Sequence, residues 1–223
     1  SSGGLARYVR ELALALAAEF PGDRITLMSE QPFRAPEGAP GNLQAVVGGP
    51  GFLERRWWLC GVQRTMARQG VNVFHGTNFV VPWLPLKPYV LTLHDLAPWR
   101  AETSGETSAF VRRRTPLQLG LGLAGRIIVP TEAVRREAIE RFGVHPSRIH
   151  VVPHAAGARF RPAAPWPHPK PYFFYVGDVV DRKNLALMAE AFFTLRGRRD
   201  VDLLLAGAAR FPAFLTERPG VVE

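Results

Sequence analysis

Apolar residues in this chain recur at two spacings, and the two spacings alternate along the sequence. Five apolar residues near the start are three or four positions apart, which is the repeat of an amphipathic helix: Leu5, Val9, Leu12, Leu16 and Phe20. Shorter segments are alternating or continuously apolar, which is typical of strands. The pattern predicts helices at 5–20, 52–69, within 108–123, at 132–142 and at 185–195. It predicts strands at 24–29, 43–47, 71–75, 90–93, 126–129, 149–152, 172–176 and 201–206.

Two of the predicted helices begin directly after a residue that can cap them. Thr131 precedes the helix at 132–142, and Asn184 precedes the helix at 185–195. Their side-chain oxygens can accept hydrogen bonds from backbone N–H groups of the first turn. Gly143 stands where a helix commonly ends on a left-handed residue.

Three predicted strands contain almost continuous apolar runs, at 151–152, 173–175 and 203–205. Such runs are expected where helices cover both faces of a parallel sheet. Because helices and strands also alternate, the sequence predicts an α/β fold with two Rossmann-like parallel-sheet units.

A proline-rich segment divides the two predicted units. Five prolines fall within residues 161–171, where fixed torsions and missing N–H donors predict a stiff, extended connector. We therefore expect a first domain at 1–160 and the beginning of a second, incomplete domain at 172–223. No strand precedes the first helix, so we expect the first strand of the first domain to be missing.

The chain is basic, with a formal net charge of +9 at pH 7, and this favours acidic partners such as phosphorylated small molecules or anionic lipid. A nucleic-acid partner is not expected, because the arginines are spread over several helices instead of gathering with stacking aromatic residues. The single cysteine, Cys60, excludes an internal disulfide and favours a reducing compartment. We expect a cytoplasmic protein, with peripheral contact to the inner membrane face as a further expectation.

The first candidate site is the Gly3–Gly4 pair ahead of the first helix. Glycines allow backbone N–H groups to approach a ligand closely, and a helix amino end favours an anion. Arg7, one turn later, would add a positive charge. The alternative is a tight turn without a ligand.

The second candidate site combines polar residues that follow two predicted strands. His94 and Asp95 follow the strand at 90–93, while His75 and Asn78 follow the strand at 71–75 in the same way. Ligands of open α/β sheets bind beyond the carboxyl ends of the strands, so these residues are expected to share a rim, to which Thr131 after a third strand also belongs. A histidine there can hold a substrate hydroxyl. The alternative is a buried histidine bonded to a backbone carbonyl, with Asp95 capping a turn.

The third candidate site is the segment GDVVDRKN (177–184), between a buried strand and a helix. Gly177 ends the strand, and Arg182 and Lys183 stand just before the helix capped by Asn184. Two cations beside a helix amino end can bind a diphosphate and stabilise negative charge on a departing phosphate. The alternatives are a solvated loop or an internal pair between Arg182 and a neighbouring aspartate.

Two basic segments suggest contact with an anionic membrane surface. The helix at 52–69 contains four arginines and two adjacent tryptophans, and residues 112–114 are three consecutive arginines. The alternatives are inward-packed tryptophans and a solvated arginine face. The sequence has no Cys-x-x-Cys pair, and no bound metal is expected.

Five segments together, in order, resemble the retaining GT-B glycosyltransferases of the group 1, or family 4, type, which include mannosyltransferases. They are GGLARY (3–8), LHDL (93–96), VPTE (129–132), RIHVVPHAAGARFRP (148–162) and YFFYVGDVVDRKNLALMAEAF (172–192). The resemblance implies a GT-B-like fold, in which two Rossmann-like units face each other across a cleft. It covers most of the acceptor-side domain and the start of the donor-side domain.

The resemblance also implies a reaction. A hexose would pass from a nucleotide diphosphate sugar, GDP-mannose or a UDP-sugar, to a glycan or lipid-linked acceptor, with retained configuration and without a metal or other cofactor. Arg182 and Lys183 would hold the diphosphate, with Gly177 and Asn184 beside it. His94, with Asp95, would act at the transferring sugar, and Gly3 and Gly4 would lie near the phosphates or the acceptor. The leaving phosphate would help to deprotonate the acceptor. Such a reaction would suit an enzyme of polysaccharide biosynthesis.

A second hypothesis is a non-catalytic sugar-binding, nucleotide-binding or partner-subunit module of the same fold. The glutamate segment that holds the donor sugar and ribose in this family would lie beyond Glu223. We therefore expect the 223-residue chain by itself to be inactive.

Overall fold

A computed structural model describes most of the chain. The described residues are 3–49, 51, 56–99, 106–157, 160–161, 168–177, 179–180, 183–207 and 211–222. Contacts between Cα atoms divide the chain into two compact units, Ser1–Phe160 and Arg161–Glu223. The two units are described separately below.

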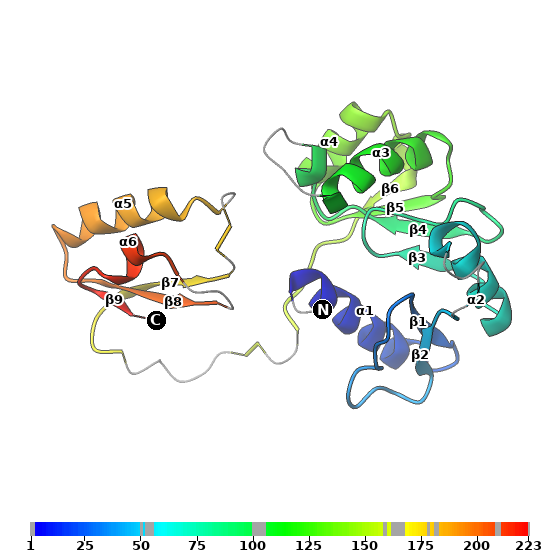
Figure 1. Cartoon of the computed structure of the whole chain (residues 1–223), viewed down its shortest axis with the longest axis horizontal. Coiled ribbons are helices and arrows are strands. Elements are labelled where there is room, and N and C mark those ends of the chain that lie inside the picture. Colours follow the sequence, from blue (N-terminus) through cyan, green and yellow to red (C-terminus); the bar gives the residue numbers. More distant parts are fainter. Residues whose placement is uncertain are drawn as a thin grey trace. The chain divides into compact units, whose positions relative to one another are not determined.

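Among the described residues of the first unit, six parallel strands form two sheets (Figure 1). A two-stranded sheet pairs β1 (Ile25–Ser29) with β2 (Leu43–Val47). A four-stranded sheet has the order β3-β4-β5-β6, with β3 at Phe74–Gly76, β4 at Tyr89–Thr92, β5 at Arg126–Val129 and β6 at Ile149–Val151. All neighbours in both sheets are parallel, as the alternation of helices and strands predicts.

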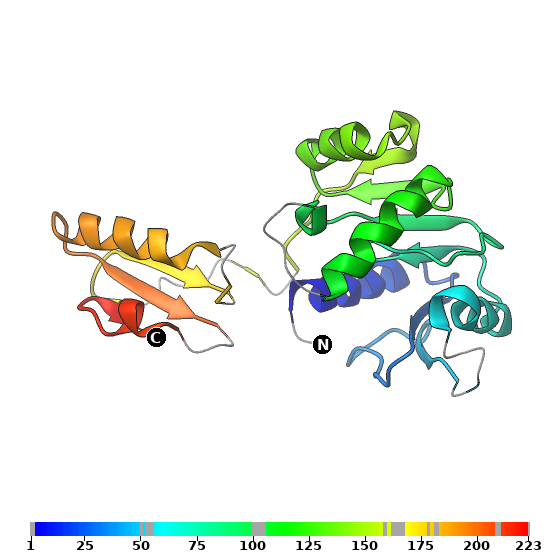
Figure 2. The same ribbon diagram turned by 45° about the horizontal axis from the view of Figure 1, so that its top comes forward.

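The described part of the first unit also has four α-helices: α1 (Gly4–Glu19), α2 (Val62–Gln69), α3 (Glu106–Gly120) and α4 (Glu132–Phe142). Helices α3 and α4 pack side by side over the four-stranded sheet (Figures 1 and 2). The predicted caps of α4 are confirmed, because the Thr131 hydroxyl accepts from the N–H of Val134 and Gly143 is left-handed.

The main core of the first unit lies between the four-stranded sheet and these helices. Leu91 and Leu93 beside β4, and Ile127 and Val129 of β5, have no exposed surface. Burying an aliphatic side chain of this size stabilises the fold by about 1.5–3 kcal/mol. The neighbouring residues Val90 and Ile128 are only partly buried. The run predicted at 151–152 is not buried on both faces, because Val152 is 50% exposed.

Helix α1 packs differently from the prediction made from its apolar stripe. Leu5 and Phe20, at the ends of the stripe, are 40% and 49% exposed. The fully packed residues are the smaller Ala13 and Ala17, which lie against Leu43 of β2. Close packing on the two-stranded sheet selects the small side chains, and the larger residues in the middle of the stripe turn toward a cavity described below.

Two further elements differ from their predicted limits. The strand predicted from residue 71 begins at Phe74, because the N–H of Val71 bonds to the carbonyl of Met66 and so closes the end of α2. The helix predicted over 52–69 begins, within the described residues, with a π-helical segment at Trp57–Gly61 that continues into α2. There the Trp57 ring packs against Gly48, and this tertiary contact overrides the regular helical repeat.

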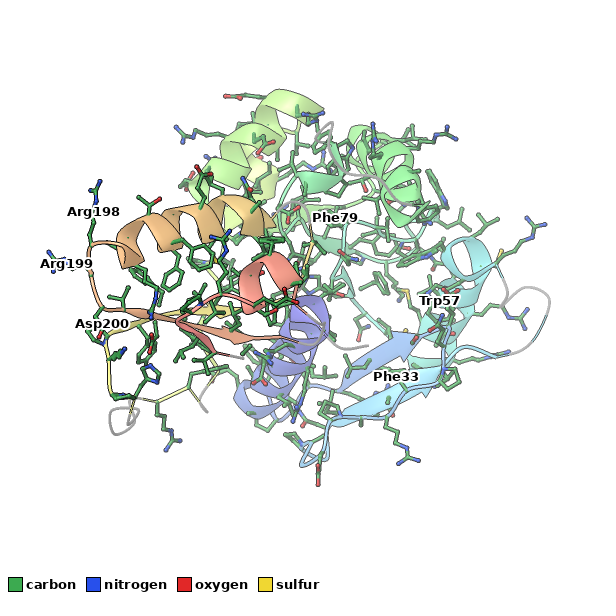
Figure 3. All side chains as sticks on the ribbon, turned by 60° about the vertical axis from the view of Figure 1, so that its left-hand side comes forward. Phe33, Trp57, Phe79, Arg198, Arg199 and Asp200 are labelled. Atoms are coloured by element: carbon green, nitrogen blue, oxygen red, sulfur yellow. The ribbon has the colours of Figure 1, made fainter. Side chains whose placement is uncertain are left out.

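The second unit contains one parallel sheet, in the order β7-β8-β9. Its elements are β7 (Tyr172–Val176), α5 (Leu185–Arg196), β8 (Asp202–Ala206), α6 (Ala213–Thr216) and β9 (Val221–Val222). Asn184 caps α5 as predicted, accepting from the N–H of Leu187. The inward side of α5 packs on β8 through Leu185, Ala189 and Phe192. At the far end of α5, the side chains of Arg198 and Arg199 point away from the unit (Figure 3).

One prediction for the second unit is wrong. The apolar run of β7 was expected to be covered on both faces, yet Phe173 and Phe174 are 52% and 60% exposed. β7 is an edge strand that pairs only with β8, and only Tyr175 of this strand packs on the described core. The described residues therefore leave much of β7 uncovered.

Hydrogen bonds around Asp202 hold the segment that leads into β7. Asp202 of β8 bonds to His168 and to Arg196, with a distance of 2.9 Å to each. The hydrogen bond from His168 is the main cause that lowers the pKa of Asp202 below its usual value. His168 belongs to the predicted connector, of which residues 162–167 lie outside the described part of the chain.

Candidate functional site

Polar side chains gather where β3 and β4 end beside the first turns of α1. Nε2 of His75 lies 2.7 Å from the hydroxyl oxygen of Thr92, and the Tyr8 hydroxyl lies 3.2 Å from the same atom. The parallel pairing of β3 with β4 brings His75 and Thr92 together, while α1 supplies Tyr8. The first unit therefore has a polar cluster at the sheet edge where the sequence predicts a rim.

His94 is held just beyond the end of β4. Its Nε2 lies 2.8 Å from the carbonyl oxygen of Thr77, which can only accept a hydrogen bond. Nε2 therefore carries the proton, and in the neutral ring Nδ1 is the acceptor. This contact to a backbone carbonyl is one of the alternatives weighed from the sequence, and it leaves Nδ1 with a lone pair on the side away from Thr77.

His154 completes the cluster, and sequence reasoning missed it as a site residue. It follows β6 as His94 follows β4, and its Nε2 lies 3.5 Å from Nδ1 of His94. The Tyr8 ring meets both imidazoles edge-on, at 4.7 Å from His94 and 5.2 Å from His154. The available signal was its place after a predicted strand, which is the same rule that singled out His94.

Burial keeps the two inner histidines neutral at neutral pH. It lowers the pKa of His75 to about 4, and the positive charge that His94 can carry acts in the same direction. Burial is also the main cause that lowers the pKa of His94, with the nearby His154 adding to it and the bond to Thr77 opposing it. Neutral imidazoles can both donate to and accept from hydroxyl groups, so this rim suits a hydroxyl-rich ligand.

The three remaining predicted residues of this rim have local contacts. Asp95 is exposed, and its carboxylate accepts from the N–H of Ala97 at 2.9 Å, so it caps the turn at Ala97–Trp99. The carbonyl of Asn78 accepts from the N–H of Val80 at 2.8 Å. Thr131 lies at the end of a third strand, but its hydroxyl is engaged in capping α4. A direct role of these residues in transfer stays a prediction.

The predicted glycine loop forms the amino end of α1. Gly3 has φ +128°, a conformation that L side chains rarely adopt, and it precedes the first helical residue, Gly4. No side chain among the described residues caps this helix end. Arg7 is exposed, with its guanidinium 5.9 Å from the centre of the Phe160 ring. Backbone N–H groups and a cation thus stand near Tyr8 and the histidine cluster.

The predicted diphosphate site lies in the second unit. Gly177 ends β7 with φ +155°, and its carbonyl oxygen is so close to Gly207 that a Cβ on Gly207 would lie 2.3 Å from it. Lys183 is exposed next to Asn184, which begins α5. Arg182 lies outside the described residues. A Lys beside the capped amino end of a helix can bind a phosphate, and the pairing with Arg182 stays a prediction.

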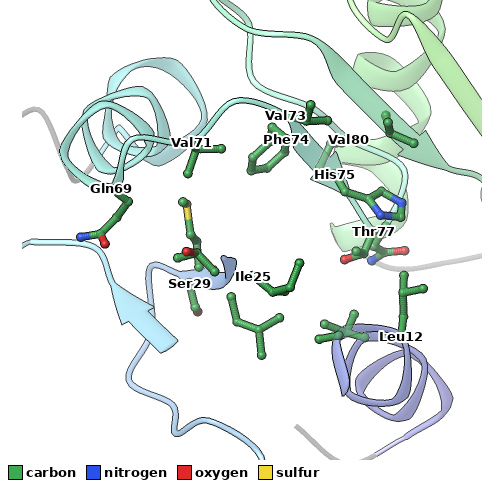
Figure 4. Close-up of a pocket in the computed structure, with 18 of the residues that line it drawn as sticks. Leu12, Ile25, Ser29, Gln69, Val71, Val73, Phe74, His75, Thr77 and Val80 are labelled. Carbon is green, nitrogen blue, oxygen red and sulfur yellow. The ribbon is translucent and has the colours of Figure 1, made fainter. Parts of the chain in front are cut away.

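A cavity of about 910 Å³ opens below this rim in the first unit (Figure 4). Its walls are the edge of β1, the segment that leads into β3, and the apolar stripe of α1, represented by Val9, Leu12 and Leu16. His75 and Thr77 stand at the right-hand side of the cavity in Figure 4. The lining combines aliphatic and aromatic side chains with charged and polar ones such as Arg24, Glu30 and Asn72, so the cavity offers both apolar and polar contacts.

Within the described residues, no group of three or more His, Cys, Asp or Glu side chains could hold a metal ion. Across the same part of the chain, no helix has both the length and the hydropathy needed to cross a membrane.

Comparison with solved structures shows which known fold this chain has. A crystal structure of a glycosyltransferase from Rickettsia africae ESF-5 is similar over 99% of this chain, with a TM-score of 0.63 and 14% sequence identity. The chain spans 64% of that protein, which is less than two thirds of its length. At this identity the similarity shows the fold alone, and it confirms the predicted GT-B-like, Rossmann-type α/β class for this chain. A search of curated proteins gave no match.

The family follows from the sequence of the first unit. Residues 2–156 match the model of Glycosyltransferase Family 4, and this range covers more than half of the chain. It includes the glycine loop, both rim histidines predicted from the sequence, and His154. The chain belongs to glycosyltransferase family 4.

Proposed function

We propose that this chain serves in the transfer of a hexose from a nucleotide diphosphate sugar, GDP-mannose or a UDP-sugar, to a glycan or lipid-linked acceptor. The observation that carries the proposal is the neutral histidine cluster around Thr92 at the end of β4, beside the amino end of α1. Family membership supports the reaction class. The choice of donor, the acceptor and the retained configuration rest on the sequence resemblance.

His94 is the residue proposed to hold the transferring sugar. Its Nε2 proton is committed to Thr77, so its Nδ1 accepts a hydrogen bond from a sugar hydroxyl once His154 gives up that position. Tyr8 packs edge-on against the His94 ring and restricts its rotation. The Asp95 carboxylate favours the charged form of the His94 ring, and so partly opposes the effect of burial on its pKa.

Anionic parts of the substrates are proposed to meet two helix amino ends. In the first unit, the N–H groups after Gly3 and Gly4, together with Arg7, offer an anion site without a capping side chain. In the second unit, Lys183 and Arg182 would neutralise the diphosphate next to Asn184 and Gly177. As the phosphate leaves, these cations stabilise its charge while one of its oxygens takes the acceptor proton. This route uses no metal and no other cofactor.

The donor class is tested by calorimetry of the full-length protein with UDP, GDP and ADP. The double variant Arg182→Ala/Lys183→Ala is expected to weaken binding of the preferred nucleotide by at least about tenfold, since each charge-assisted contact contributes about 1.5–3 kcal/mol. The matched control is Arg198→Ala/Arg199→Ala, which removes the same charge at the other end of α5 (Figure 3). Equal losses in both variants would show only a general charge effect.

The role of His94 is tested separately from donor binding. The variant His94→Ala is expected to keep the nucleotide affinity and to lose transfer activity, because its contact is to the sugar. If no nucleotide binds at millimolar concentration, the non-catalytic module of the same fold replaces the proposal. We place the protein in the cytoplasm, in keeping with its single cysteine, Cys60.

A further inference from the structure

A long part of the first unit carries positive charge without any acidic residue. The 38 residues from 56 to 93 contain no Asp or Glu, but they contain Arg56, Arg64, Arg68 and Lys87. Helix α3 adds three consecutive arginines at 112–114. Glu106 begins α3, but basic residues outnumber acidic ones along these segments, and such an excess attracts an anionic partner over distances of about a Debye length.

Arg114 joins the three segments that form this region. Its guanidinium lies 5.0 Å from the ring centre of Trp58, 4.9 Å from that of Trp83 and 5.2 Å from that of Phe110. The N–H of Trp83 donates to the carbonyl of Trp58 at 3.1 Å. The π-helical segment, the loop at 82–88 and α3 are therefore fastened together as one surface.

Six large apolar side chains on these segments are exposed. They are Leu59, Leu84, Leu86, Phe110, Leu117 and Leu121, here called the docking surface, and they are 40–67% exposed. Single exposed leucines are common in soluble proteins, but these six stand on or next to the three segments that Arg114 joins. This arrangement calls for a partner that covers apolar surface.

The exposed residues of α3 share one side of the helix. With an advance of about 100° per residue, Phe110, Leu117 and Leu121 fall within an arc of about 40°, and Arg114 lies at the border of that arc. Because Arg114 faces Trp58 and Trp83, the apolar stripe of α3 borders the loop at 82–88. The stripe and the loop therefore present their apolar side chains next to each other.

The loop at 82–88 is built to hold its leucines outward. Prolines at 82, 85 and 88 restrict its backbone, and the carbonyl of Leu84 accepts hydrogen bonds from the side chains of Gln63 and Tyr89. With that carbonyl anchored, the side chains of Leu84 and Leu86 remain 44% and 67% exposed. Lys87 follows directly and is also exposed.

We propose that the docking surface binds the face of an anionic membrane, with its leucines and Phe110 entering the boundary between headgroups and acyl chains and the basic residues contacting lipid phosphates. Tryptophans close to such a surface are typical of membrane interfaces, and Trp58 and Trp83 lie here. A membrane fits better than a protein partner, because it offers apolar and negative groups over the whole surface at once. This inference does not depend on the transfer reaction proposed above.

The test is cosedimentation of the full-length protein with vesicles. Vesicles of phosphatidylcholine with about one third phosphatidylglycerol are expected to bind the protein, and pure phosphatidylcholine vesicles are expected to bind it at least tenfold more weakly. The variant Leu84→Glu/Leu86→Glu is expected to lower binding to the anionic vesicles by more than about tenfold, because it removes apolar insertion and adds repelling charge. The matched apolar control is Leu187→Glu, at a leucine of α5 with 58% exposure.

The charge contribution is tested with a second matched pair. Arg113→Glu is expected to weaken binding to anionic vesicles about tenfold or more, while Arg136→Glu, an equal charge change on an exposed face of α4, is expected to leave most of it. Circular dichroism of each variant without vesicles shows whether it folds. The proposal is overturned if Leu84→Glu/Leu86→Glu and Leu187→Glu bind anionic vesicles equally well. A second result would also overturn it: the unchanged protein does not bind vesicles but self-associates, and Leu84→Glu/Leu86→Glu abolishes that self-association. The surface would then pair with a second copy of the chain.

Discussion

Acidification is expected to destabilise the first unit through His75. Burial, together with the neighbouring His94, lowers the pKa of His75 from 6.5 to about 4. The unfolded chain therefore binds a proton at a higher pH than the folded unit does. By linkage, the contribution of His75 to stability is fully present above about pH 6.5, falls as the pH decreases from there, and levels off below about pH 4.

The size of this effect follows from the pKa difference. A lowering of about 2.5 pKa units corresponds to at most about 3.4 kcal/mol, at about 1.36 kcal/mol per unit. Between about pH 7.5 and about pH 4.5 the folded ring is still mainly neutral, and about 2.5 kcal/mol of this is lost. That is a large part of the 5–15 kcal/mol that stabilises a typical domain, so it can be measured.

The assay is urea unfolding at these two pH values, followed by tryptophan fluorescence. Trp57, Trp58, Trp83 and Trp99 all belong to the first unit, so the signal reports mainly on that unit. In the variant His75→Gln, the amide can still reach the Thr92 hydroxyl but does not titrate. The difference in unfolding free energy between the two pH values should shrink by about 2.5 kcal/mol in this variant.

The control is His145→Gln, at an exposed position of the same unit where the imidazole bonds to Ser147. The expected result is that the loss of pH dependence is larger in His75→Gln than in this control. If His75→Gln leaves the pH dependence unchanged, burial of a neutral imidazole at this position is refuted as the cause.

Three further outcomes can be measured on the same protein. Thr131→Ala removes the hydroxyl that caps α4 and is expected to lower the unfolding free energy of the first unit by about 1 kcal/mol in urea titrations. Asn184→Ala should destabilise the second unit by about 1 kcal/mol or more. Asn184→Gly should destabilise it less, because residue 184 has φ 47°, which glycine adopts readily, and the melting temperature of Asn184→Gly should therefore be the higher of the two. His154→Ala should raise the pKa of His94 by removing a neighbouring charge, and an NMR titration of the His94 ring that moves the other way would contradict the proximity of the two rings.

Local features of the fold were accessible from the sequence. The strands at 43–47, 126–129 and 172–176 and the caps at Thr131 and Asn184 agree with the structure. Each of these depends on neighbouring residues only, through apolar spacing or a side chain that bonds to its own helix. The start of β3 was misplaced because a single hydrogen bond from Val71 to α2 decided it.

The candidate site was only partly accessible. The rule that polar residues gather beyond strand ends found His75 and His94, but their shared contacts come from residues distant in the chain. Tyr8 and Thr92 are 84 positions apart, and His94 and His154 are 60 positions apart. Arg114 shows the same limit, because three consecutive arginines suggest a solvated face, whereas this one is 6% exposed between aromatic rings from three segments.

The cavity of the first unit separates two strand edges, and this affects how the chain behaves in concentrated solution. Within the described residues β1 pairs only with β2, and β3 pairs only with β4, so each has a side whose backbone groups lack a strand partner. Such edges are templates for another extended segment. Samples of the 223-residue chain are therefore expected to form strand-exchanged oligomers that grow with protein concentration, and a charged residue placed along either edge should keep them monomeric.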